Sequence, residues 1–102
     1  MFLETVLSET NMELIYDKYD KEFLECIDPY NFAYIYNLFL NNKFYFIEDL
    51  IVKYLEMFTI RKEIIEDAIY SLEEEYGIDY VYRIGKDLTI LDDAINKELE
   101  RL

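Results

Sequence analysis

The chain has 102 residues, of which 23 are acidic and 10 are basic, and it has no histidine, so its formal net charge is −13. This length fits a single domain over residues 1–102, and a hydrophobic content of 53% excludes a disordered acidic tail. The charge argues against direct binding to nucleic acid or to an anionic membrane, because both kinds of binding depend on Lys and Arg.

The sequence also bears on the compartment. Its longest uncharged stretch, residues 29–42, is short and interrupted by asparagines, so no membrane span is expected. No basic residue precedes Lys18, and a signal peptide would need one. Cys26 is the sole cysteine, which forbids an internal disulfide and fits a reducing compartment. We therefore expect a cytoplasmic protein.

The first long helix is predicted over residues 10–27. Thr10 and Glu13 have the spacing of a capping box, in which each side chain binds a free backbone amide. One face of this helix carries an apolar stripe: Met12, Ile15, Tyr16, Tyr19, Phe23, Cys26 and Ile27. Because Cys26 belongs to the stripe, a buried and unreactive thiol is expected.

Asp28 and Pro29 predict the start of a second helix, which extends to about residue 41. Apolar side chains surround this helix on nearly every side, so it should be central or covered by a partner. A third helix is predicted over residues 47–58, where apolar residues recur with helical spacing. Thr59 is then expected to cap a helix over residues 60–76, which Gly77 terminates.

The segment 78–84 is ambiguous, because it alternates like a strand and also suits a short helix. A strand there would have to pair with residues 2–7, and we favour a helix or an irregular turn. A last helix begins near Asp87 or Thr89. The expected fold is all-α, a single small bundle of about five helices, with the short strand pair (2–7 with 78–84) as a minor variant.

The predicted helix over residues 60–76 has an unusual charge pattern. Opposite its apolar stripe, five carboxylates surround one tyrosine over about 16 Å of helix. These residues are Glu63, Glu66, Asp67, Tyr70, Glu73 and Glu74. Like charges one turn apart destabilise a helix by about 0.2–0.5 kcal/mol per pair. Three interpretations of this face are open: a solvated surface, a weak cation site or a surrogate for nucleic-acid phosphates. If the tertiary packing allows, the face is extended by four further acids, Glu75, Asp79, Asp92 and Asp93.

A second candidate surface lies in the segment from Tyr30 to Phe46, which holds eight aromatic residues. Core packing explains most of them. Exposed tyrosines would instead serve as interface anchors or as a homodimer seam, because Tyr is enriched at binding hot spots. The candidates for this role are Tyr30, Tyr34, Tyr36 and Tyr45.

Catalysis and metal binding are not expected. Without histidine there is no imidazole ligand for zinc and no imidazole base to activate a Cys or Ser nucleophile. No calcium-binding loop, glycine-rich phosphate loop or dinucleotide motif is present. We therefore expect neither a metal, nor a cofactor, nor a catalytic residue.

Two functions follow from these surfaces. In the first, the chain is an inhibitor whose acidic face occupies the basic groove of a nucleic-acid-binding enzyme. In size, charge and composition it resembles small acidic anti-defence proteins of phages and mobile elements, such as anti-CRISPR and anti-restriction inhibitors. In the second, it is a non-enzymatic interaction or assembly module that uses residues 30–46, either antitoxin- or immunity-like or a homodimeric adaptor.

Overall fold

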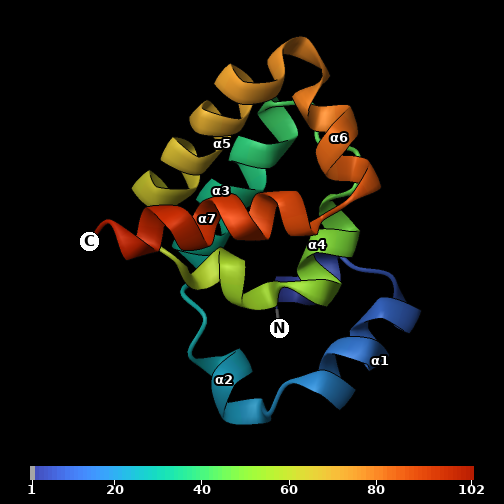
Figure 1. The fold of residues 1–102 in the computed structure, drawn as a ribbon. Coiled ribbons are helices and arrows are strands. Elements are labelled where there is room, and N and C mark those ends of the chain that lie inside the picture. The colour runs from blue at the N-terminus through green and yellow to red at the C-terminus, as the bar shows by residue number, and fades with distance from the viewer. Residues whose placement is uncertain (1) are drawn as a thin grey trace.

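The computed structural model describes residues 2–102 and has the expected all-α fold (Figure 1). The helices in this range, with 3-10 helices written as η, have the following bounds: η1 (Phe2–Thr5), α1 (Glu9–Lys18), α2 (Lys21–Glu25), α3 (Pro29–Asn41), α4 (Ile47–Lys53), η2 (Leu55–Thr59), α5 (Lys62–Tyr76), η3 (Gly77–Asp79), α6 (Tyr80–Lys86) and α7 (Thr89–Glu100). No strand forms between residues 2 and 102, so the minor strand pair (2–7 with 78–84) is not found.

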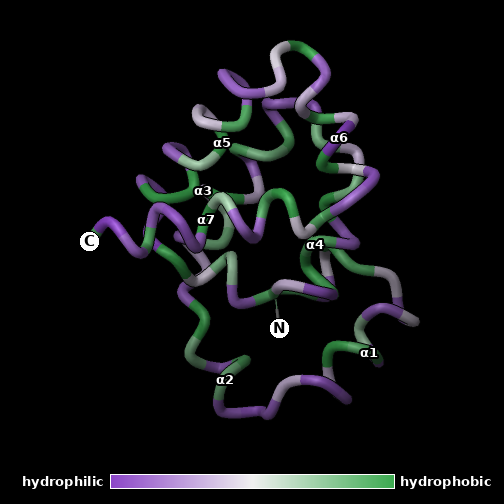
Figure 2. Tube along the Cα trace, in the orientation of Figure 1, coloured by the Kyte–Doolittle hydropathy of each residue, from purple (hydrophilic) through white to green (hydrophobic). Residues whose placement is uncertain are grey.

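The helices are arranged around α3 and α5. α5 packs against α7, α3 and α6, whereas α4 and η2 pack against α3. α1 and α2 form an arm at the end of the molecule away from α5 (Figure 1). In Figure 2 the outer edge of α5 is hydrophilic, and its hydrophobic segments turn inward. Among residues 2–102, no helix has the length and apolarity needed to cross a bilayer.

Aromatic rings form the middle of the core. Phe58 of η2 is fully buried and stacks on Phe32, with ring centroids 4.9 Å apart. The same ring meets the edge of Phe39 at 5.5 Å, and Phe39 stacks on Phe44 at 5.0 Å. No polar or charged residue is buried within the described part of the chain. Folding is therefore driven by apolar burial, with no buried polar network to satisfy.

The prediction of a single helix over residues 10–27 is wrong in two respects. It begins earlier, because the Ser8 hydroxyl accepts the Asn11 amide at 3.2 Å and Thr10 lies inside α1. It is also divided, because Tyr19 is extended and the Asp20 carboxylate accepts the Phe23 amide at 2.9 Å, which starts α2. An aspartate that caps a helix competes with continuation of the preceding one.

This division also overturns the expectation for Cys26, whose side chain is exposed rather than buried. Cys26 sits at the carboxyl-terminal cap of α2 and not within a continuous helical stripe. Once the helix is interrupted at residues 19–20, the helical spacing that placed Cys26 with Met12 and Ile15 no longer applies.

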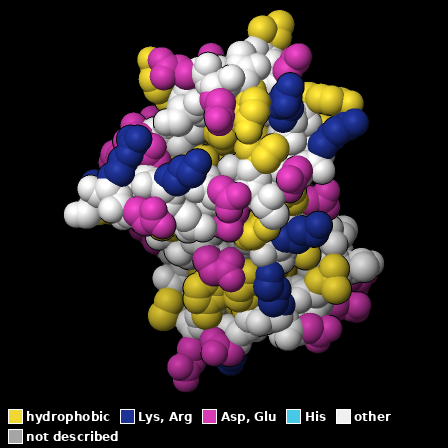
Figure 3. Space-filling model, viewed as in Figure 1, with side chains coloured by type: hydrophobic (Ala, Val, Ile, Leu, Met, Phe, Trp, Pro, Cys, Tyr) yellow, Lys and Arg dark blue, Asp and Glu magenta, His cyan; other side chains and the backbone are white. Residues whose placement is uncertain are grey.

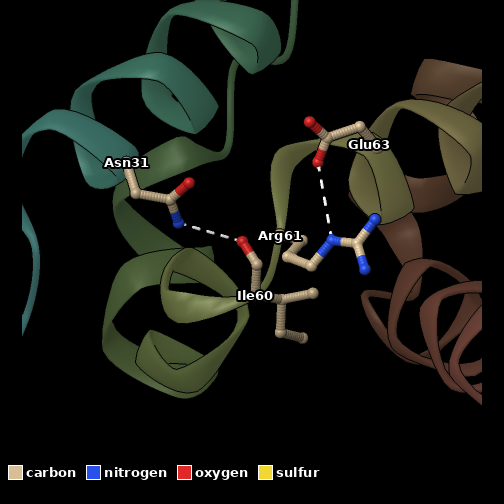
Figure 4. Close-up of polar contacts among 4 residues, drawn as sticks. All are labelled: Asn31, Ile60, Arg61 and Glu63. Atoms are coloured by element: carbon tan, nitrogen blue, oxygen red, sulfur yellow. Dashed lines mark hydrogen bonds and ion pairs between the residues drawn. The ribbon is translucent and has the colours of Figure 1, made fainter.

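The second helix begins as predicted. The Asp28 carboxylate accepts the Tyr30 amide at 2.9 Å, and Pro29 takes the first helical position. The Asn31 side chain then donates to the Ile60 carbonyl at 2.9 Å (Figure 4) and to the Phe58 carbonyl at 3.2 Å. These two bonds attach the start of α3 to the connection between η2 and α5.

The expected helix over residues 47–58 ends early, at Lys53, and continues as η2 after a break at Tyr54. Thr59 does not cap α5: its hydroxyl donates to the Glu56 carbonyl at 2.6 Å, and α5 begins only at Lys62. At the last helix, the Asp87 carboxylate accepts the Thr89 amide at 3.1 Å, so Asp87 is the capping side chain.

Gly77 ends α5, as predicted. Its backbone has φ 69° and ψ −148°, a region that is essentially restricted to glycine. Nothing lies within 4 Å of the position that a Cβ would occupy, so the need for glycine is conformational and not steric. This turn sends the chain back as η3 and α6, and α6 packs against the helix that Gly77 terminates.

Replacing Gly77 with Ala should therefore destabilise the fold through backbone strain alone. We expect Gly77→Ala to lower the free energy of unfolding by about 1–3 kcal/mol. Ser71→Ala, an exposed substitution in α5, should change it by less than about 0.5 kcal/mol. Urea denaturation followed by circular dichroism measures the free energy of unfolding of both variants. Equal stabilities would contradict the conformational requirement for glycine at position 77.

Candidate functional site

α5 places the predicted acidic residues on one face. Its buried side chains are Ile64, Ile65, Ala68, Ile69 and Leu72, and they face α3 and α7. The opposite side carries the residues that we call the acidic face: Glu63, Glu66, Asp67, Tyr70, Glu73 and Glu74. All of these are exposed except Glu66, which is half-buried at the edge next to α3. Regular helical geometry thus keeps the five carboxylates and the tyrosine together.

Few cations accompany these carboxylates. At the amino end of the acidic face, Arg61 Nε lies 3.8 Å from Glu63 Oε2 (Figure 4), and both side chains are largely exposed. Within residues 2–102, no ion pair involves Glu66, Asp67, Glu73 or Glu74. The carboxyl-terminal part of the acidic face is therefore the part with uncompensated negative charge.

Tyr70 lies among these charges and is 63% exposed. The hydrogen bond from its hydroxyl to Glu74 raises the pKa of Tyr70, and the negative charges of Glu74 and Glu73 act in the same direction. The phenol thus stays protonated and presents a flat ring between carboxylates. Such a ring offers a stacking surface for a guanidinium group that also binds the neighbouring acids.

The acidic face adjoins part of the predicted aromatic surface. The Tyr34 hydroxyl donates to Glu66 Oε2 at 3.4 Å, and Lys62 Nζ lies 4.5 Å from the centre of the Tyr34 ring. Tyr30, one turn earlier on α3, is 86% exposed. Tyr30 and Tyr34 line a hollow between the starts of α3 and α5 that also includes Arg61 and Lys62.

The other two aromatic candidates lie elsewhere. Tyr36 is half-buried and stacks on Phe32, with ring centroids 6.3 Å apart. Tyr45 packs against Phe46 and lies across the backbone of Gly85 in α6. The four tyrosines thus do not form one patch: Tyr30 and Tyr34 border the acidic face, and Tyr36 and Tyr45 do not share their surroundings.

A further acidic group forms where α7 meets η2. Burial raises the pKa of Asp92, and the charges of Asp93 and Glu56 add to this effect. The pKa of Tyr54 is raised as well, by burial and then by Asp92, Asp87 and Asp93. Asp93 also lines a hollow between α5 and α7 together with Glu75 of α5, whereas Asp92 is grouped with Glu56 of η2. The sequence points to Asp92 and Asp93 but not to their grouping with Tyr54 and Glu56, because those two residues are far from them in the chain.

The carboxylates do not form a metal-binding cluster. Among residues 2–102, no three Cys, Asp or Glu side chains are placed to hold a metal ion together. Along the acidic face, neighbouring carboxylates diverge around the helix and remain in solvent. Carboxylates in this arrangement act as separate charges and do not form a coordination sphere.

Comparison with known proteins assigns no relative: no family model, curated protein or solved structure matches the chain. What points to a function is therefore its own surface. The relevant properties are the uncompensated charge of the acidic face and the two exposed tyrosines beside it.

The hydrogen bond to Glu74 gives a testable consequence for Tyr70. Glu74→Gln removes the charged acceptor, so the pKa of Tyr70 should fall toward its ordinary value of about 10. The measurement is an NMR titration of the Tyr70 ring. Glu100→Gln, an equal change of charge at the end of α7, should leave the pKa of Tyr70 in place, and an identical effect of both substitutions would refute a local cause.

Asp92 provides a test of pH dependence. Its pKa is higher in the folded than in the unfolded chain, so its ionised form opposes folding at neutral pH. We expect Asp92→Asn to raise Tm by about 1–3 °C at pH 7. The gain should disappear as the pH falls below about 3.9, where Asp92 is protonated in both states. Thermal melts across this range measure it, and a gain that persists at low pH would contradict the argument.

Proposed function

We propose that this chain is a small acidic inhibitor that acts by binding, with its acidic face in the basic groove of a nucleic-acid-binding protein. The observation that carries the proposal is the row of exposed carboxylates on α5, where Asp67, Glu73 and Glu74 have no ion-pair partner among residues 2–102. An anti-defence role against a nuclease of a bacterial host belongs to this proposal.

The geometry supports binding to closely spaced cations. Carboxylates one helical turn apart are separated by about 5–6 Å along the acidic face. Lys and Arg side chains that follow a phosphate backbone present charges at a comparable spacing. The half-buried Glu66, bound by Tyr34, gives this row one anchored carboxylate.

Electrostatics would set both the rate and the selectivity of such binding. A net charge of −13 attracts a basic groove over a long distance, and a concentrated row of charges orients the encounter. The same charge repels DNA and RNA, so the protein would compete with nucleic acid for its target and would not bind nucleic acid itself.

Exposed aromatic rings would add contact area to this interface. Tyr30 and Tyr34 extend the acidic face onto the open side of α3, where Leu40 is also half exposed. The same observation supports the alternative function, an interaction or assembly module in which α3 makes the main contact. The salt dependence of binding distinguishes the two functions, because charge-dominated binding weakens as ionic strength rises, whereas apolar contact persists.

The test uses a charge reversal on the acidic face, Glu66→Lys with Asp67→Lys and Glu73→Lys. Its control reverses three exposed acids at scattered sites, Glu9, Asp49 and Glu100, and so gives the same net charge. Each variant and the unmodified chain are immobilised and exposed to the heparin-binding proteins of a bacterial lysate. Circular dichroism verifies that both variants fold.

We expect the unmodified chain and the scattered control to retain a nucleic-acid-binding protein that elutes at about 0.3–0.5 M salt and is displaced by a short DNA duplex. The reversal on the acidic face should weaken retention by about 100-fold or more. Equal retention by both variants would show that the acidic face is not the binding surface. A partner that resists salt and ignores DNA would favour the assembly module.

A further inference from the structure

The bend between α1 and α2 carries a groove that the proposed function does not use. It encloses about 560 Å³ and lies at the end of the molecule away from α5 (Figure 1). The residues that line it are Tyr16, Tyr19, Asp20, Lys21, Leu24 and Glu25. In Figure 3, hydrophobic side chains gather in the lower part of the view, near α2, with both acidic and basic side chains beside them.

The groove exists because the helix is interrupted. The extended conformation of Tyr19 and the cap at Asp20 turn α2 away from the direction of α1. Side chains that would have spread around one continuous helix instead face each other across the bend. As a result, the ring of Tyr16 remains 52% exposed beside the apolar side chain of Leu24.

One wall of the groove is held in place by hydrogen bonds. The Tyr19 hydroxyl donates to Glu56 Oε1 at 3.0 Å and accepts the Leu55 amide at 3.2 Å. Its ring stacks on Phe23, with centroids 5.2 Å apart. Burial, with the bond to Glu56, raises the pKa of Tyr19 to about 12, so this donor is retained at all physiological pH values. A ligand would therefore meet a fixed aromatic wall.

The rim of the groove is negative. Its lining includes the carboxylates of Asp20 and Glu25, and the hydroxyls of Tyr16 and Tyr19 donate to two further carboxylates, Glu4 and Glu56. The two lysines nearby, Lys18 and Lys21, are engaged with groups of this chain. Lys18 Nζ donates to the Lys53 carbonyl at 2.6 Å, and Lys21 Nζ lies 3.8 Å from Glu25 Oε1. Lys18 Nζ also lies 5.2 Å from the centre of the Tyr19 ring, so a partner's cations would meet the carboxylates of the rim and not this ring.

We infer that this groove is a second docking surface, which receives the apolar side chains of a cationic amphipathic helix from a partner protein. Apolar residues one turn apart on such a helix would enter the groove, and flanking Lys or Arg would meet the acidic rim. A second copy of this chain is a poor occupant, because it would bring another net charge of −13 to a negative surface.

The test uses the full chain, labelled with ¹⁵N, and a synthetic helical peptide of about 14 residues with Leu on one face and Lys on the other. Two matched peptides replace either Leu with Ala or Lys with Glu. We expect the Leu–Lys peptide to shift the amide signals around the α1–α2 bend. Both matched peptides should bind at least about tenfold more weakly, because each lacks one half of the complementarity.

Substitutions at the groove and away from it locate the contact. Tyr16→Ala should raise the Kd of the Leu–Lys peptide about tenfold, whereas Tyr16→Phe, which keeps the ring, should leave it unchanged. Tyr82→Ala removes a similarly exposed tyrosine of α6 and should also leave it unchanged. An unaltered Kd for Tyr16→Ala, absence of binding, or signal shifts confined to α5 would overturn the inference.

The two triple charge reversals separate this inference from the proposed function. Both give the same net charge, so both should bind the Leu–Lys peptide with equal affinity if the groove is the site. A weaker affinity for the reversal on the acidic face alone would place the peptide on α5 and overturn the inference. Retention of nucleic-acid-binding proteins is a separate measurement, so either proposal can fail without the other.

Discussion

The contact between Phe58 and α3 is the interaction on which the rest of the structure depends. Phe58 belongs to a five-residue 3-10 helix, which is too short to be stable in isolation. Its ring is buried against Phe32 and Phe39, and this contact orders η2 on the surface of α3. The position of η2 in turn sets where α5 begins. The location of the acidic face therefore follows from an aromatic contact in the core.

Charge contributes little to holding the molecule together. The ion pairs found within residues 2–102 all involve at least one well-exposed side chain, and such pairs contribute about 0–1 kcal/mol each. Stability must come from apolar burial, while the many acids repel one another. Salt should then have opposite effects on the two properties of the protein: it screens the internal repulsion, and it weakens attraction to a basic partner.

Local signals predicted much of the fold. Asp28, Pro29 and Gly77 each act through the backbone next to them, so their roles in starting and ending helices could be inferred from the sequence. The break at Tyr19 was missed, because an apolar stripe with helical spacing continues through it and conceals the local cap at Asp20. Contacts from η2 support the same break, since Glu56 and Leu55 hold the Tyr19 hydroxyl. The same limit applies to the candidate surfaces: the acidic face lies on one helix, whereas its contact with Tyr34 and the grouping of Asp92 with Glu56 arise from tertiary packing.

The two hydrogen bonds from the Asn31 side chain have a consequence for the entropy of binding. They connect the first turn of α3 to the carbonyl groups that precede α5, so the two helices cannot shift independently at this end. These bonds, together with the one between Tyr34 and Glu66, restrain the separation of the two side chains before a partner binds. A partner that contacts both helices would order few additional degrees of freedom, and most of the interaction energy would remain available as affinity.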